Sequence, residues 1–103
     1  MIVQVLPGAR MDLIQAAEFW NNQESGLGLE FLNFILPEID QLKATAGMHR
    51  KTGKYHRAVI LGRFPYYSIY YQLNEGFAEV FAVIDTRRNP RWVQNLLRRR
   101  RRA

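Results

Sequence analysis

Apolar residues recur at helical spacing through the first half of the chain. A short β-branched segment, residues 2–6, ends at a Pro-Gly pair, which predicts a strand followed by a turn. Residues 9–24 then repeat apolar side chains at three- and four-residue steps, as does a second run over residues 29–42. Ser-Gly-Leu-Gly at 25–28 separates the two runs, so we predict two antiparallel helices. Pro37 lacks an amide hydrogen and should kink or divide the second helix.

The second half changes to short, β-branched and aromatic segments. The three predicted strands span residues 55–62, 63–73 and 77–85. Residues 47–54 are polar and bounded by glycine, so we expect a loop there. Asn74-Glu75-Gly76 predicts a hairpin turn, and Pro65 lies near the start of its strand, where a missing donor does least harm. Residues 91–97 predict a short terminal helix.

The order of elements, β-α-α-β-β-β with a short C-terminal helix, predicts an α+β fold. We expect an antiparallel sheet of about four strands, with the helical hairpin packed on one face. The 103 residues suit a single domain with one core. We assign residues 1–97 to this domain and residues 98–103 to a basic tail.

The composition excludes several kinds of chemistry. The chain is 48% hydrophobic and 23% charged, as globular domains are, and it has no cysteine for disulfides, thiolate nucleophiles or metal ligation. His49 and His56 do not form a zinc-binding spacing, so we expect neither a metal nor another cofactor. The N-terminus does not resemble a signal peptide and the apolar runs are short, so we expect a cytoplasmic protein without membrane contact.

Charge is divided unevenly between the two halves. Residues 1–49 hold two Lys or Arg against six Asp or Glu, whereas residues 50–103 hold thirteen against three. This asymmetry favours a polyanionic or acidic partner for the second half, either nucleic acid or a protein segment. The five arginines at 98–102 are compatible with nucleic-acid binding and equally with a disordered, solubilising tail.

Aromatic and imidazole side chains have both structural and functional interpretations. The tyrosines of the 63–73 segment could stack on bases, but such a segment is more often packed in the core. They are Tyr66, Tyr67, Tyr70 and Tyr71. His56 has no Cys, Ser or Asp partner near it in sequence, so we interpret it as a hydrogen-bonded structural residue.

A series of short motifs spans nearly the whole chain, and its order and spacing resemble the RelE/ParE superfamily of toxins, also known as plasmid stabilisation proteins. The motifs are Asp12-Leu13, Trp20, Gly26-Leu27-Gly28, Phe31, His56-Arg57, Arg63-Phe64-Pro65-Tyr66, Tyr70-Tyr71, Ala82-Val83, Arg87-Arg88-Asn89-Pro90 and Trp92. The resemblance implies the toxin of a type II toxin–antitoxin pair, which arrests growth and is neutralised by a cognate antitoxin protein.

The superfamily includes RelE-like proteins, which cleave mRNA on the ribosome, and ParE-like proteins, which inhibit DNA gyrase. RNA cleavage needs a base, phosphate-stabilising cations and an acid. Arg63, Arg88, Lys51 and Lys54 are the available candidates, but the catalytic set is not fixed by the resemblance. Ser68 occupies the position of the family's middle-strand arginine, and the C-terminal tyrosine is missing.

The ParE-like branch fits better, because it needs a binding surface and no catalytic constellation. Asp85 replaces a histidine found in many relatives, which removes a candidate base. We therefore expect a gyrase inhibitor without a small-molecule substrate; the alternatives are a ribosome-dependent endoribonuclease and a degenerate toxin that acts only as a binding partner. The candidate residues for binding a partner or nucleic acid are Arg57, Arg63, Arg87, Arg88, Arg98, Arg99 and Arg100.

Overall fold

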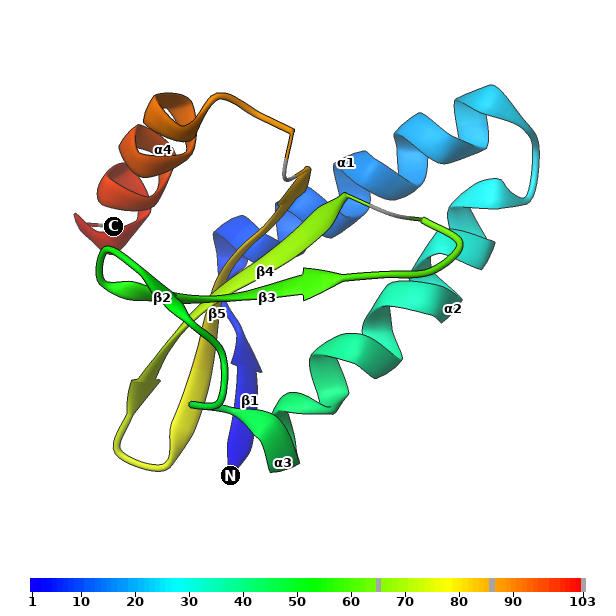
Figure 1. Cartoon of the computed structure of the whole chain (residues 1–103). Helices are drawn as coiled ribbons and strands as arrows, with labels where there is room; N and C mark the ends of the chain where they lie inside the picture. The colour runs from blue at the N-terminus through cyan, green and yellow to red at the C-terminus, as the bar shows by residue number, and fades with distance from the viewer. Residues whose placement is uncertain (65, 86, 103) are drawn as a thin grey trace.

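The computed structural model describes residues 1–64, 66–85 and 87–102. Its helices and strands follow one another around a single sheet (Figure 1). The elements are β1 (Ile2–Val5), α1 (Pro7–Gln23), α2 (Leu27–Asp40), α3 (Leu42–Thr45), β2 (Lys51–Thr52), β3 (Tyr55–Ile60), β4 (Tyr67–Asn74), β5 (Phe77–Asp85) and α4 (Pro90–Arg102). The predicted α+β fold and the predicted order of its main elements are confirmed.

The sheet has five strands in the order β1-β5-β4-β3-β2. Antiparallel hairpins join β2 to β3, β3 to β4 and β4 to β5, as expected from the short connections between them. The strand beyond the expected four is β2, two residues within the predicted loop. β1 pairs with β5 in parallel. The helical hairpin carries the chain from β1 to the opposite edge of the sheet, and the antiparallel strands that follow lead back to β5 beside β1.

Several element boundaries differ from those predicted. The second helix continues through Pro37, and the break falls at Gln41, where the Gln41 amide still donates to the Pro37 carbonyl over 3.0 Å. The 63–73 strand begins at Tyr67, because Tyr66 has a φ of 77° and interrupts extended backbone. The predicted position of Pro65 lies outside the described residues. Positive φ at Glu75 and Gly76 confirms the expected hairpin turn.

The helical hairpin packs on one face of the sheet, as predicted. Its buried side chains, among them Leu13, Phe31 and Ile35, meet Ile69, Tyr71 and Val80 of the central strands. Burial of these apolar surfaces supplies the main stabilisation of the domain.

The other face of the sheet is covered by α4. Val93 and Leu97 pack against Tyr55, Tyr70 and Ile84 in a second core cluster, and the hydroxyl of Tyr55 donates to the Leu97 carbonyl over 3.2 Å. The terminal helix is also longer than the predicted 91–97, because it continues through the arginine run to Arg102. In Figure 1, α4 lies at the opposite end of the molecule from the turn between α1 and α2.

Candidate partner-binding surface

The edge of β5 is only partly covered by its neighbouring strand. Four residues of β1 pair with Phe77–Val80, so the last part of β5 extends beyond β1. Two side chains satisfy backbone groups there: Val83 N–H donates to Asp12 Oδ2 over 3.0 Å, and Arg100 Nη1 donates to the Phe81 carbonyl over 3.0 Å. Because strand edges left open invite pairing with other chains, these contacts protect the edge.

Asp12 and Arg100 also bind each other through two hydrogen bonds, of 2.6 and 2.8 Å. The Asp12 side chain is 9% exposed and that of Arg100 is 20% exposed, so the pair is largely desolvated. Sequence reasoning missed this contact and assigned Arg100 to partner binding. The helical spacing of the first helix could have indicated it, because Asp12 lies on the same face as Ala9, Leu13 and Ala16, which contact the core. A carboxylate on a buried face needs a partner.

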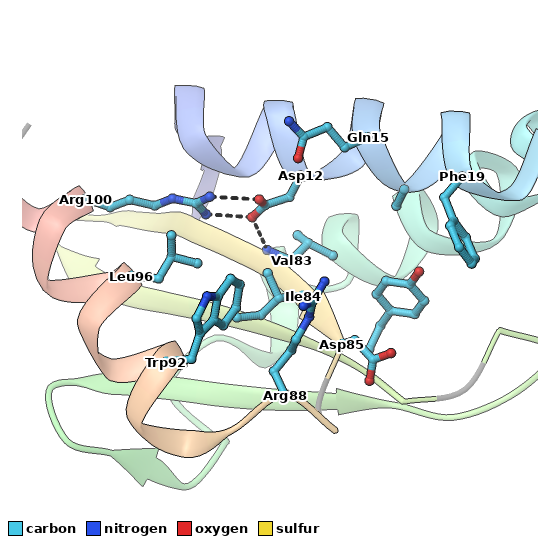
Figure 2. Close-up of a pocket in the computed structure, with 12 residues that line it drawn as sticks. Asp12, Gln15, Phe19, Val83, Ile84, Asp85, Arg88, Trp92, Leu96 and Arg100 are labelled. Carbon is cyan, nitrogen blue, oxygen red and sulfur yellow. Dashed lines mark hydrogen bonds and ion pairs between the residues drawn. The ribbon is translucent and has the colours of Figure 1, made fainter.

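A cleft of about 400 Å³ lies beside this edge, between α1, β5 and α4. Figure 2 shows Phe19 of α1 on one side and Trp92 of α4 on the other, with Arg88 next to Trp92. The guanidinium carbon of Arg88 lies 4.9 Å from the centre of the Trp92 ring. Phe19 and Trp92 are 54% and 40% exposed, so the cleft combines aromatic surface with the Arg88 cation. Arg100, Asp12 and Asp85 also line it.

Asp85 and Arg87 form a separate contact at the end of β5. Arg87 donates to both carboxylate oxygens of Asp85, and these bonds hold the pKa of Asp85 below its ordinary value. The Arg87 guanidinium also lies 4.4 Å from the centre of the Tyr66 ring. Arg87 is thus oriented by a local anion and an aromatic ring at the surface.

Arg57 lies on the sheet face that carries α4. Its Nε donates to Ser68 Oγ over 3.0 Å, and its guanidinium lies 6.0 Å from the centre of the Tyr70 ring. Ser68 is completely buried beneath this contact. The position at which the resemblance expects an arginine therefore supplies a buried hydroxyl that holds Arg57 in place.

The four candidate catalytic residues lie on different parts of the molecule. Arg63 makes a two-bond ion pair with Glu30 of α2, of 3.0 and 3.2 Å, whereas Arg88 lies in the cleft beside α4. Lys51 and Lys54 belong to the β2–β3 hairpin. Since Lys54 precedes β3 and Arg63 follows it, the six residues of β3 separate them by about 20 Å. The four residues do not line one cleft.

The tyrosine and histidine side chains are mainly structural. Tyr67, Tyr70 and Tyr71 are buried, whereas Tyr66 is half exposed. His56 stacks on Tyr71, with ring centres 5.0 Å apart, and its Nδ1 lies 2.7 Å from the His49 carbonyl oxygen. The hydrogen-bonded interpretation of His56 agrees with this geometry.

Two of the remaining candidates, Arg98 and Arg99, lie exposed on α4, apart from Arg100 and its ion pair.

No helix in the described part of the chain combines the length and apolarity needed to cross a bilayer.

No family model and no curated protein matches the chain by sequence. A solved structure described as the chromosomal ParDE toxin–antitoxin system from P. aeruginosa contains a chain that superposes with a TM-score of 0.73. The alignment covers 82% of this chain and 95% of that one, at 12% identity.

The chain has a ParDE-type fold. This agrees with the fold implied by the sequence resemblance to RelE/ParE proteins. At 12% identity the likeness concerns the fold alone. In this fold the cleft lies between α1, the end of β5 and α4.

Proposed function

We propose that this chain is the toxin of a type II toxin–antitoxin pair, that it acts in the cytoplasm, and that it inhibits DNA gyrase by binding in the manner of ParE-like proteins. The ParDE-type fold is the observation that carries the proposal. The sequence motifs that resemble the same superfamily add support. Fold alone does not define activity, so the choice of target rests on the residues of the surface.

The arrangement of cations favours binding over RNA cleavage. A nuclease needs its base, acid and phosphate-stabilising cations around one scissile bond. Arg63 is paired with Glu30, and Lys51 and Lys54 lie at the other end of β3 from Arg63. Arg88 lines a cleft with Trp92, whose indole cannot donate a proton as an acid. An inhibitor that acts by binding does not need these groups to lie around one bond.

The antitoxin in this proposal covers the outer face of the α1–α2 hairpin. Four apolar side chains on this face are about half exposed or more, which is more than a solvated helical face needs. They are Met11, Ile14, Leu29 and Leu36. A shallow groove between Ala17 and Leu32 runs along the same face. The sheet face opposite the hairpin is less open to a partner, because α4 packs on it.

Expression with and without a neighbouring antitoxin gene tests the proposal. We expect growth arrest on expression of the chain alone, rescue by the antitoxin, inhibited gyrase supercoiling with the purified chain, and intact mRNA. Cleavage of mRNA at the ribosomal A site would assign the chain to the endoribonuclease alternative instead. Absence of arrest, with antitoxin binding retained, would identify a degenerate toxin.

A further inference from the structure

The turn of the β2–β3 hairpin and the outer side of α4 enclose a second pocket, of about 240 Å³. Lys54 enters it from the hairpin, and Arg98 and Arg101 enter it from α4. Gly53 has a φ of 65°, a left-handed backbone conformation that glycine adopts without strain, and this conformation forms the turn beside the helix. The bond from Tyr55 to the Leu97 carbonyl fixes the two elements relative to each other.

These three cations form no ion pair within the described part of the chain. The arginines that do so, Arg63, Arg87 and Arg100, each have a carboxylate partner. Beyond Asp85 the sequence contains no Asp or Glu at all. Three cations held together without an Asp or Glu partner among the described residues repel one another, and an anionic ligand removes that repulsion.

The helix extends this cationic pocket along its surface. Arg91 and Arg98 are seven residues apart, which places them on the same side of α4 and about 10 Å apart along its axis. Asn95 and Arg99 are also exposed there, and these outer positions carry no large apolar side chain. Protein interfaces usually have an apolar or aromatic centre, whereas nucleic-acid interfaces are polar and strongly positive.

We propose that Lys54, Arg98 and Arg101 bind the phosphodiester backbone of a nucleic acid, with Arg91 contacting a phosphate further along the strand. Guanidinium groups bind phosphate oxygens through paired hydrogen bonds, and the lysine adds a point charge. The site contacts backbone only, so it contributes affinity without sequence preference. Arg100 is excluded from it by its bonds to Asp12. Such a site does not depend on gyrase being the target of the chain.

Fluorescence anisotropy tests the proposal with three labelled probes: a 20-base-pair DNA duplex, a 20-nucleotide RNA and a polyglutamate peptide. Lys54→Gln/Arg98→Gln is compared with Arg10→Gln/Lys43→Gln, which removes the same charge from exposed positions of α1 and α3. Circular dichroism and thermal melting establish that both variants fold. Binding of each probe is measured from about 50 to 200 mM salt.

We expect the unmodified chain to bind nucleic acid with a steep salt dependence. The Lys54/Arg98 variant should lower the magnitude of the log K against log salt slope by about 2, near 1 for each phosphate group that is no longer bound, while the control variant keeps the slope. Equal slopes for DNA and RNA support recognition of backbone charge alone, and a difference identifies the preferred backbone. Equal reductions in the two variants, or binding of polyglutamate without nucleic acid, would overturn the proposal.

Discussion

Asp12 and Arg100 meet although 88 residues separate them, and together they satisfy two backbone groups at the edge of β5. A carboxylate from α1 and a guanidinium from α4 thus occupy the part of the strand edge where a further strand would otherwise pair. Burial makes this contact more consequential than an exposed ion pair, because either partner alone would be a poorly solvated charge. The pair therefore links the edge of the sheet to the position of α4.

Removing one partner of this pair should destabilise the fold. We expect Arg100→Gln to lower the free energy of unfolding by about 2–3 kcal/mol, somewhat below the cost for fully buried pairs because the arginine keeps some solvent contact. Asp12→Asn should cost less, since its amide oxygen still accepts from Val83. Urea unfolding of both single variants and the double variant measures the coupling. Strictly additive effects would contradict a direct interaction between the two side chains.

A second polar group at the residue scale is His49. Its Nδ1 lies 2.6 Å from the hydroxyl of Tyr71, which also accepts the Gly47 amide over 2.9 Å. Burial, followed by the nearby His56, lowers the pKa of His49 from its ordinary 6.5. The folded chain therefore favours the neutral ring.

Stability should consequently depend on pH through His49. Because the unfolded chain takes up the proton at higher pH than the folded chain, the contribution is complete above about pH 6.5 and is lost as the pH falls toward the lowered pKa of the fold. His49→Asn removes this titration. We expect the loss of unfolding free energy between about pH 7 and pH 5 to be smaller in the variant. Identical pH profiles would show that His49 does not contribute.

At the scale of elements, the two hairpin helices approach most closely at Gly28. A Cβ atom there would lie 2.5 Å from the Ala17 carbonyl oxygen and 3.1 Å from the Asn21 Cβ. The Ala17 carbonyl oxygen is fixed by its helix and cannot move away easily, so the absence of a side chain at Gly28 permits α2 to pack on α1. The apolar face outside this contact remains available to a partner.

Gly28→Ala should destabilise the chain although alanine favours helix. We expect a loss of about 1–3 kcal/mol from overpacking, which exceeds the gain of about 1 kcal/mol from helix propensity. Asn33→Ala, at an exposed position of the same helix, should change stability by no more than about 0.5 kcal/mol. Denaturant unfolding compares the two. A Gly28→Ala variant as stable as the parent would mean that the helices can separate without cost.

The outer face of the hairpin gives a prediction about the antitoxin. Leu29 is 65% exposed and Leu36 is 47% exposed, so glutamates at these positions should leave the fold intact. Under the proposed binding mode, Leu29→Glu/Leu36→Glu should weaken antitoxin binding at least tenfold, because it places two charges in an apolar interface. Calorimetric titration measures the affinity, with Leu61→Glu as the control, because Leu61 is 79% exposed and lies outside the hairpin helices. Unchanged affinity would locate the antitoxin elsewhere.

At the scale of the whole molecule, the sequence predicts the α+β fold because hydrophobic periodicity and turn residues are local signals. It predicts β5 and the Glu75-Gly76 turn closely for the same reason. The parallel pairing of β1 and the Asp12–Arg100 contact depend on residues far apart in sequence, so no local pattern reveals them. The length of α4 was also missed, because a run of arginines resembles a disordered tail until Arg100 has a carboxylate partner.

The grouping of functional residues is likewise a property of the folded chain. The sequence presents Arg63, Arg88 and the loop lysines as one cationic set, whereas β3 separates Lys54 from Arg63 and Glu30 pairs with Arg63. It treats Arg98, Arg99 and Arg100 as equivalent, whereas the helix directs Arg100 toward α1 and leaves its neighbours exposed. Charge composition therefore predicts a basic surface but not its division into sites.

The central proposal is that this chain acts by binding gyrase without cleaving RNA. The most direct measurement is a supercoiling assay with purified gyrase and increasing amounts of the chain, accompanied by mRNA integrity in a translating extract. The proposal predicts that supercoiling decreases as the chain is added, while mRNA stays intact. Unaffected supercoiling together with cleaved mRNA would contradict it.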